Sequence, residues 1–266
     1  MKIIHLSDLH FGTESPQLTE ILTQNVKDMS PNLIVVSGDF AQIASKKEFL
    51  QAEEFISQFD CPVFCVPGNH DISHYNILER LFAPFKSYRK YITQELNPYM
   101  ELEDVCLQGL NSARAVLPHW NWANGAVSDK QIALLKALFQ ERTGLGICVL
   151  HHPVHKAEEP TIPVKVFGSK KLLKALDGMN VDIVLTGHVH HPSAQKIGST
   201  IFISASTALS SRKRGHENGF NVLNIEDNML LVEHVTYDGM EGFVKETEKR
   251  FKLRESLGSK QKHQNS

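Results

Sequence analysis

Leu33-Ile34-Val35-Val36-Ser37-Gly38-Asp39 joins four apolar residues directly to a small polar turn and a carboxylate. A continuous apolar run of this length predicts a strand buried on both faces, because a strand with one wet face alternates apolar and polar residues. Similar apolar runs that end at polar or ionisable residues recur along the chain. They are Ile3–Leu6, Val63–Val66, Ile147–Leu150 and Ile183–Leu185.

Helical periodicities separate several of these strands. Apolar residues recur three or four positions apart over residues 18–29, 49–59, 132–139 and 172–176. Ser128 and Ser169 are in place to cap the last two helices. Alternation of strand and helix is typical of βαβ units around a largely parallel sheet.

The pattern changes after residue 190. Strands with short connections are predicted over 193–197, 200–204, 221–225 and 229–237, which indicates an antiparallel second sheet. Both patterns fit an α/β fold, a four-layer αββα sandwich of two mixed β-sheets flanked by helices. No linker divides the chain, so we expect a single domain over residues 1–257. Residues 242–257 predict a charged helix, and residues 258–266 a disordered polar tail.

The composition excludes several classes of protein. Lys+Arg number 28 against 30 Asp+Glu, and 41% of residues are hydrophobic, so neither a disordered chain nor one that binds long nucleic acid is expected. No apolar run approaches the roughly 18 residues of a membrane span. His5 and Asp8 interrupt the first apolar run before it could serve as a secretory signal. We therefore expect a cytoplasmic protein without a membrane span.

Half of the 14 histidines lie where the predicted buried strands end. In open α/β sheets, ligands bind outside the carboxyl ends of the strands, so these positions predict a functional site. The polar residues at the five strand ends are Asp8 and His10, then Asp39, then Asn69, His70 and Asp71, then His151 and His152, and last His188, His190 and His191.

Spacing narrows the choice among these residues. Side chains at i and i+2 of an extended segment point to the same side, so Asp8 with His10, and His188 with His190, can each present two ligands to one space. By the same reasoning, His190 is favoured over His191.

The neighbours His151 and His152 point to opposite sides of an extended segment. Pro153 biases His152 towards extended backbone, so the two rings are not expected to converge. We favour His151 as the one that faces the site.

The donor types indicate which cofactors fit. Carboxylates, imidazoles and an amide carbonyl form a mixed nitrogen and oxygen set without thiolates, which suits manganese, iron or zinc better than magnesium alone. Asp8 and Asp39 against two divalent cations leave a net charge of about +2, which a phosphodiester and a hydroxide would neutralise. This balance suits a two-metal phosphoesterase.

The five strand-end blocks together resemble the signature of the calcineurin-like metallophosphoesterase superfamily, over residue 3 to about residue 191. The resemblance implies two divalent metal ions, with a bridging hydroxide that attacks phosphorus in line. One metal would be held by Asp8, His10, Asp39 and His190, and the other by Asp39, Asn69, His151 and His188.

The resemblance also implies roles for residues that do not bind metal. His70 resembles the histidine that protonates the leaving oxygen or stabilises its charge, and Asp71 could orient that ring. The sequence departs from many members at Gln42, where they carry an acidic residue, so hydrogen bonding around the metal ligands is expected to differ there.

Three loops carry candidate substrate-binding residues whose roles stay open. Arg212 and Arg214 could grip a phosphate or lie in a solvated turn. Trp120 and Trp122 could stack on a base or cover the core. The aromatic residues of 82–91, interleaved with basic ones, could grip an acyl chain or a membrane surface, or pack as helices against the core.

The functional hypotheses differ in substrate and in class. Within the superfamily the sequence most resembles the class III cyclic-nucleotide phosphodiesterases, so a small phosphodiester, with a 3',5'-cyclic nucleotide as the leading candidate, is the expected substrate. Alternatives are a UDP-diacylglucosamine pyrophosphatase, another phosphoester hydrolase of the superfamily, and a non-catalytic metal-bound scaffold. Nuclease activity on long DNA or RNA ranks lower, and a homodimer is a family-level expectation.

Overall fold

The computed structural model describes residues 1–117, 119, 121–140, 142, 144–155, 164–240 and 242–254. Two six-stranded sheets form its centre. The first has the order β14 (Phe243–Lys252), β13 (Met229–Tyr237), β12 (Gly219–Glu226), β1 (Lys2–Leu6), β2 (Leu33–Val36), β3 (Val63–Cys65). The second has the order β10 (Ser193–Ile197), β11 (Thr200–Ser204), β9 (Ile183–Thr186), β7 (Leu145–Val149), β5 (Val105–Gly109), β4 (Tyr99–Leu102).

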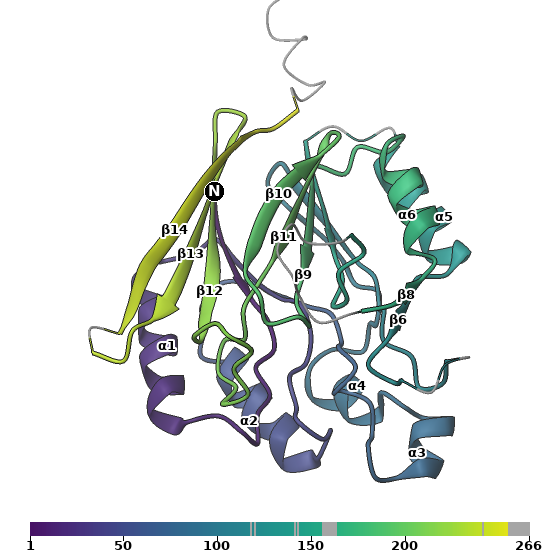
Figure 1. Cartoon of the computed structure of the whole chain (residues 1–266), viewed down its shortest axis with the longest axis vertical. Coiled ribbons are helices and arrows are strands. Elements are labelled where there is room, and N and C mark those ends of the chain that lie inside the picture. Colours follow the sequence, from purple (N-terminus) through teal and green to yellow (C-terminus); the bar gives the residue numbers. More distant parts are fainter. Residues whose placement is uncertain are drawn as a thin grey trace, which may run out of the picture.

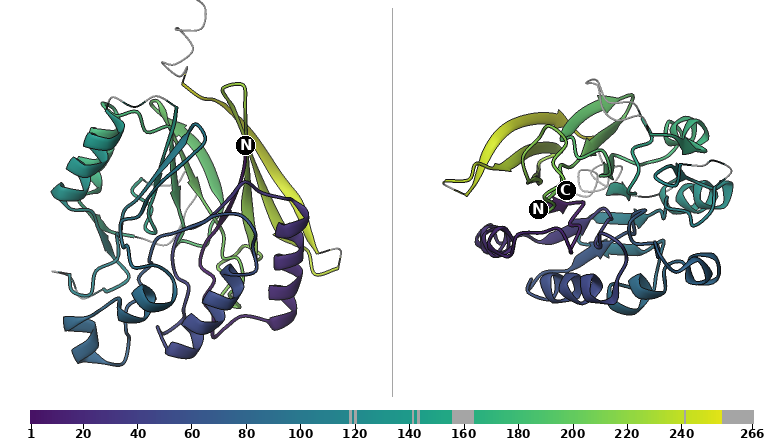
Figure 2. Two further views of the ribbon diagram at one scale, coloured as in Figure 1. Left: turned by 180° about the vertical axis from the view of Figure 1, so that it is seen from behind. Right: turned by 60° about the horizontal axis from the view of Figure 1, so that its bottom comes forward.

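Helices cover the outer faces of both sheets (Figures 1 and 2). The helices are α1 (Pro16–Asp28), α2 (Lys46–Ile56), α3 (Ile77–Phe82), α4 (Lys86–Tyr91), α5 (Asp129–Phe139) and α6 (Ser169–Leu176). A short parallel pair, β6 (Gly125–Ala126) with β8 (Val166–Phe167), lies below α5 and α6 in Figure 1. No helix of the described residues is both long enough and apolar enough to cross a bilayer.

Three apolar layers hold the sandwich together. Alternate residues of β2 divide between two of them: Leu33 and Val35 pack between the sheets, whereas Ile34 and Val36 pack under α1 and α2. The third layer joins the second sheet to α5 and α6, with Leu135 and Leu172 among its members. The four-layer αββα sandwich is thus confirmed, because strands covered on both sides are those that read as continuous apolar runs.

The predicted βαβ elements are present within a few residues of their expected bounds. Ser128 caps α5 as predicted, and its hydroxyl accepts from the amide of Gln131. Ser169 is not a cap: it is the first residue of α6, and Gly168, with φ of 83°, takes the N-cap position.

The late strands do not form a second sheet of their own, so that prediction was wrong. β12 and β13 extend the first sheet beside β1, whereas β10 and β11 join the second beside β9. Both sheets therefore mix parallel and antiparallel pairs.

The charged helix predicted over residues 242–257 is also wrong, because β14 occupies residues 243–252 as the edge strand of the first sheet. Its charged residues pair across strands and along their own strand; Lys245 lies 3.3 Å from Glu233 and 2.8 Å from Glu248. Charged side chains on an edge strand discourage pairing with other chains. The predicted tail, residues 258–266, lies outside the described residues.

Candidate metal centre

The five strand ends named above meet between the two sheets. β1, β2 and β3 are parallel neighbours in the first sheet, and β7 and β9 are parallel neighbours in the second. The segments after β1 and β2 run side by side, with the amide of His10 donating to the carbonyl of Asp39 at 3.0 Å. The two sheets are joined here, because the amide of His188 donates to Asp8 Oδ2 at 2.9 Å.

Unusual backbone angles bring these side chains inward. Asp8, His10, Asp39, His188 and His190 all have positive φ, between 48° and 70°. Left-handed backbone is costly for residues with a Cβ and clusters at functional sites. The prediction that Asp8 and His10 face one space is confirmed, but its reason was wrong, since neither residue is extended.

One group of ligand atoms comes from Asp8, His10 and His190, all buried. His190 Nε2 lies 3.0 Å from Asp8 Oδ1 and 3.4 Å from His10 Nε2. His10 Nε2 lies 3.6 Å from Asp8 Oδ1. Three potential ligands from both sheets thus face one point.

A second group comes from Asp39, His151 and His188. His151 Nε2 lies 3.2 Å from Asp39 Oδ2 and 3.2 Å from His188 Nδ1. The same Asp39 oxygen lies 3.7 Å from His10 Nε2 of the first group. Asp39 Oδ2 is therefore placed between the two groups. His188 and His190 face the same site but enter different groups, which is the division that the resemblance implies.

The Asp8 and Asp39 carboxylates each use one oxygen in hydrogen bonds to the protein and leave the other free to bind a cation. Asp8 Oδ2 accepts from the Ser7 hydroxyl at 2.6 Å and Asp39 Oδ1 from the His70 amide at 2.8 Å, so the other oxygen of each faces the imidazoles. Asn69 Oδ1 is buried and lacks a hydrogen-bond partner among the described residues. These oxygens are available to a cation.

Burial favours the neutral, metal-binding form of two imidazoles of the site, those of His10 and His188. Burial lowers the pKa of His10, and burial together with the neighbouring His151 lowers the pKa of His188 to about 3. Burial acts the same way on His151, but the Asp39 carboxylate outweighs it and raises the pKa of His151 to about 9. A proton held between His151 and Asp39 is one that a cation would replace.

The arrangement of lone pairs fits a cation. His190 Nδ1 donates to the carbonyl of Arg212 at 3.1 Å, so in the neutral ring the lone pair is on Nε2, which faces Asp8 Oδ1. That oxygen has no hydrogen-bond partner among the described residues. Two facing lone pairs repel unless a proton or a cation lies between them, and nitrogen with oxygen donors suits divalent manganese, iron or zinc.

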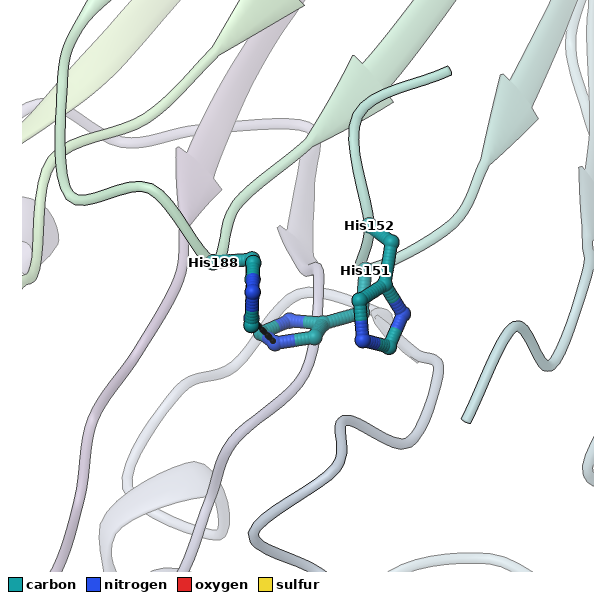
Figure 3. Close-up of side chains that lie close together, drawn as sticks. All are labelled: His151, His152 and His188. Carbon is teal, nitrogen blue, oxygen red and sulfur yellow. Dashed lines mark hydrogen bonds between the residues drawn. The ribbon is translucent and has the colours of Figure 1, made fainter. Parts of the chain in front are cut away.

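His152 joins the second group, contrary to prediction. Figure 3 shows its ring beside those of His151 and His188, and potential ligand atoms of all three lie within 4.8 Å of one another. Its Nδ1 lies 2.8 Å from the Ser112 hydroxyl, and its buried Nε2 has no partner among the described residues. The alternation rule failed because both histidines lie beyond the end of β7, in a bend.

Glycine is required where the strand-end segments cross. A Cβ at Gly187 would lie 1.8 Å from the Ser7 hydroxyl and 2.5 Å from Asp8 Oδ2. A Cβ at Gly68 would lie 2.1 Å from Asp39 Oδ1. Any larger residue at either position would displace a carboxylate of the site.

His70 lies beside the first group, and one of its ring nitrogens lies within 4.8 Å of ligand atoms of His10 and Asp39. Its ring centroid is 4.8 Å from that of His10, and it stacks on His74 at 5.3 Å. His70 Nδ1 donates to the main-chain carbonyl of Gln42 at 2.7 Å, which leaves Nε2 to hold or release a proton. No residue pattern singled out His74, which lies four positions on.

Asp71 does not orient the His70 ring, so that expectation is corrected. Its Oδ1 accepts from the amides of Phe40 and Ala41, and its Oδ2 from those of Asp39 and Gly68, at 2.8 to 3.1 Å. Asp71 instead fixes the backbone that carries Asp39.

We predict that Asp71→Asn lowers the free energy of unfolding by about 2 to 4 kcal/mol, because an amide nitrogen cannot accept from the N–H groups that now face a carboxylate oxygen. Urea denaturation of the chelator-treated protein measures this without a metal contribution. The exposed Asp177→Asn serves as control. A change below about 0.5 kcal/mol would contradict the structural role of Asp71.

Of the candidate substrate-binding residues, those of the 210–219 loop lie against the metal ligands, whereas Trp122 packs against another side chain. The carbonyl of Arg212 holds His190, and the Arg214 guanidinium donates to the carbonyl of His188 at 3.0 Å, so this loop lies against the site. The half-exposed Trp122 ring packs under the guanidinium of Arg80 at 4.2 Å. Trp120 lies outside the described residues.

The chain resembles known proteins in sequence and fold. Residues 1–192 match the family model described as calcineurin-like phosphoesterase. The chain is 26% identical to a component of the SbcCD nuclease of Staphylococcus epidermidis, over 88% of this chain and 68% of that protein. It is 26% identical to the 3',5'-cyclic adenosine monophosphate phosphodiesterase CpdA of Haemophilus influenzae, over 71% and 70% of the two chains.

The fold also matches a dimetal phosphatase from Danio rerio, with a TM-score of 0.67 at 12% identity, over 96% of this chain and 99% of that one. At that identity the likeness shows the shared fold.

Proposed function

Because the chain belongs to the calcineurin-like phosphoesterase family and is therefore a metal-dependent phosphoester hydrolase, we propose that it is a phosphodiesterase acting on a small diester. The observation that carries this proposal is the pair of buried ligand groups with Asp39 Oδ2 between them. A pair of cations held this way can clamp both the attacking and the leaving oxygen of a phosphoryl transfer.

The residues present suit two divalent cations. Asp8, His10, Asp39 and His190 would hold one, and Asp39, Asn69, His151 and His188 the other. When bound, such ions supply Lewis-acid charge for the phosphate oxygens and make water more acidic. His152 Nε2 is a further donor beside the second group.

His70 would handle the proton of the leaving oxygen. Its Nδ1 donates to the Gln42 carbonyl, which orients the ring and leaves Nε2 as the atom that exchanges a proton. Its ring lies next to His10, at the side of the first group. The Arg214 guanidinium borders the same site and suits a negatively charged substrate, whereas Arg212 contacts the site through its main-chain carbonyl.

A 3',5'-cyclic nucleotide is our leading substrate. The similarity to CpdA supports it, as does the near-neutral charge of the chain, since a grip on long nucleic acid usually needs a basic surface. The similarity to the SbcCD nuclease makes long DNA the competing diester.

The first test compares hydrolysis of bis-p-nitrophenyl phosphate and p-nitrophenyl phosphate by manganese-loaded protein, with Asp39→Ala as the blank. We expect the diester to be hydrolysed at least about tenfold faster and the blank to be inactive. A cyclic-nucleotide screen follows, with linear DNA as a parallel substrate. Preference for the monoester would contradict the proposal.

A lipid pyrophosphate is the second candidate substrate, as for a UDP-diacylglucosamine pyrophosphatase, and exposed apolar residues in α3 and just before it favour this candidate. Tyr75, Leu78 and Phe82 are 81%, 70% and 83% exposed. Of the four aromatic residues of 82–91, Phe85 and Tyr88 are buried and Tyr91 half-buried, so only Phe82 departs from core packing. Activity on such a lipid but not on cyclic nucleotides would select this candidate.

The remaining expectations stay predictions. Manganese, iron and zinc all fit the donors, and the metal content of the purified protein decides among them. The single domain over residues 1–257, the cytoplasmic location and the homodimer rest on the sequence alone. A non-catalytic scaffold is the alternative if the loaded protein hydrolyses none of these substrates.

A further inference from the structure

A cavity of about 370 Å³ lies apart from the metal ligands. Its walls come from the α3–α4 turn, the segment before β4, the segment that follows β5 and the start of α5. Phe85 contributes an apolar wall, whereas Asn97, Asn111, Ser128 and Gln131 are polar. Arg114 is the one ionisable residue among the nine that line it.

Arg114 has no anionic partner among the described residues. Its Nη1 donates to the carbonyls of Asn111 at 2.6 Å and Ala113 at 2.8 Å, and its Nη2 donates to Gln131 Oε1 at 2.8 Å. All three acceptors are neutral. By contrast, Arg142 pairs with Glu101 and Arg254 with Asp182.

A half-buried guanidinium without a counter-charge is costly, and burial lowers the pKa of Arg114 for that reason. Three of its five N–H groups are used within the described part of the chain. The Nε hydrogen and one Nη2 hydrogen remain for a ligand. An anion in the cavity would supply the missing charge.

The amides of the cavity also have donors to spare. Asn97 Oδ1 accepts from the Asn111 amide at 3.0 Å, and Asn111 Oδ1 accepts from the Ala113 amide at 2.9 Å. Backbone N–H groups can only donate, so these bonds fix which end of each side chain is oxygen. Neither NH₂ group has a hydrogen-bond partner among the described residues. Both can therefore donate to a ligand that brings its own acceptor atoms.

The first turn of α5 borders the cavity without adding free donors. Its capping box occupies the Gln131 amide, and Asp129 places a negative charge in the same turn. Ser128 and Gln131 of this turn line the cavity. Gln131 Oε1 is already occupied by Arg114 and by the amide and hydroxyl of Ser128.

We propose that this cavity is an anion-binding site, in which Arg114 and the NH₂ groups of Asn97 and Asn111 bind the phosphate or carboxylate group of a small molecule. The site is separate from the proposed catalytic function and does not depend on it. Among the described residues no hydrogen bond or ion pair joins Arg114 to a candidate metal ligand. Ser112, two residues before it, hydrogen bonds to His152. The segment 112–114 would therefore lie between the bound anion and the second group of metal ligands.

Calorimetric titration with inorganic phosphate tests the proposal, using chelated Asp39→Asn as the parent so that the metal centre does not take up phosphate. We expect one site per chain with a Kd of about 1 mM or tighter. Adding Arg114→Gln should weaken binding at least about tenfold, and adding Arg114→Lys, which keeps the charge but not the fork, should weaken it less. Acetate in place of phosphate distinguishes a carboxylate from a phosphate ligand.

Arg89→Gln is the matched control, because Arg89 is exposed and the substitution removes the same charge. It should leave phosphate binding unchanged. Thermal unfolding and circular dichroism verify that each variant is folded. If the parent bound neither anion at about 10 mM, roughly ten times the expected Kd, the proposal would be overturned. Equal binding by the Arg114→Gln and Arg89→Gln variants would also overturn it.

Discussion

Asp39→Asn is expected to lower the turnover of a phosphodiester by at least about 10³-fold and to reduce the bound metal below two ions per chain. Its Oδ2 lies 3.2 Å from His151 and 3.7 Å from His10, one nitrogen from each ligand group. The substitution keeps the size of the side chain but removes the charge that both cations would share. Elemental analysis of the dialysed protein and steady-state kinetics measure the two effects.

Asp182→Asn is the matched control, because Asp182 is also buried but precedes β9, at the opposite end of that strand from His188. It accepts from Arg254 and from the Gly146 amide, so its loss should cost stability without changing the metal content. If Asp39→Asn kept two ions and more than a tenth of the activity, the shared position of Asp39 would be wrong.

The central strands could be predicted from the sequence, because a strand that is buried on both faces appears as a continuous run of apolar residues. The run Leu33–Val36 is continuous since its residues pack alternately into two apolar layers. The ligands were predictable for a related reason: carboxyl ends of neighbouring parallel strands must meet, so Asp8 and Asp39 could be placed together without coordinates.

The predictions failed where the backbone is not regular strand or helix, and where the role of a residue depends on its neighbours in the folded chain. His152 was excluded by an alternation rule that holds only inside strands, whereas it lies in a bend. The charged residues of β14 read as a helix because an edge strand need not alternate strictly when most of it is exposed. The role of Asp71 depends on four backbone amides that no residue pattern reveals.

The second large effect concerns His70, and it depends on the leaving group. His70→Ala is expected to slow hydrolysis of a 3',5'-cyclic nucleotide by about 10²-fold, because an alkoxide needs a proton as it leaves. Hydrolysis of bis-p-nitrophenyl phosphate should fall by about tenfold or less, since p-nitrophenolate leaves without one. Metal content should stay unchanged if His70 acts on the leaving oxygen; because a ligand atom of His70 lies within 4.8 Å of those of His10 and Asp39, elemental analysis of the variant tests this directly.

His74→Ala separates this chemistry from the packing of the loop. His74 stacks on His70, but its own Nδ1 bonds to the carbonyl of Ile72, so its loss should slow both substrates equally and only by a few-fold. An equal loss on both substrates in His70→Ala would show that His70 only shapes the site. A His70→Ala protein with the wild-type rate on both would remove it from the reaction, whereas a selective loss on the alkyl ester identifies Nε2 as the proton donor, since Gln42 holds the other nitrogen.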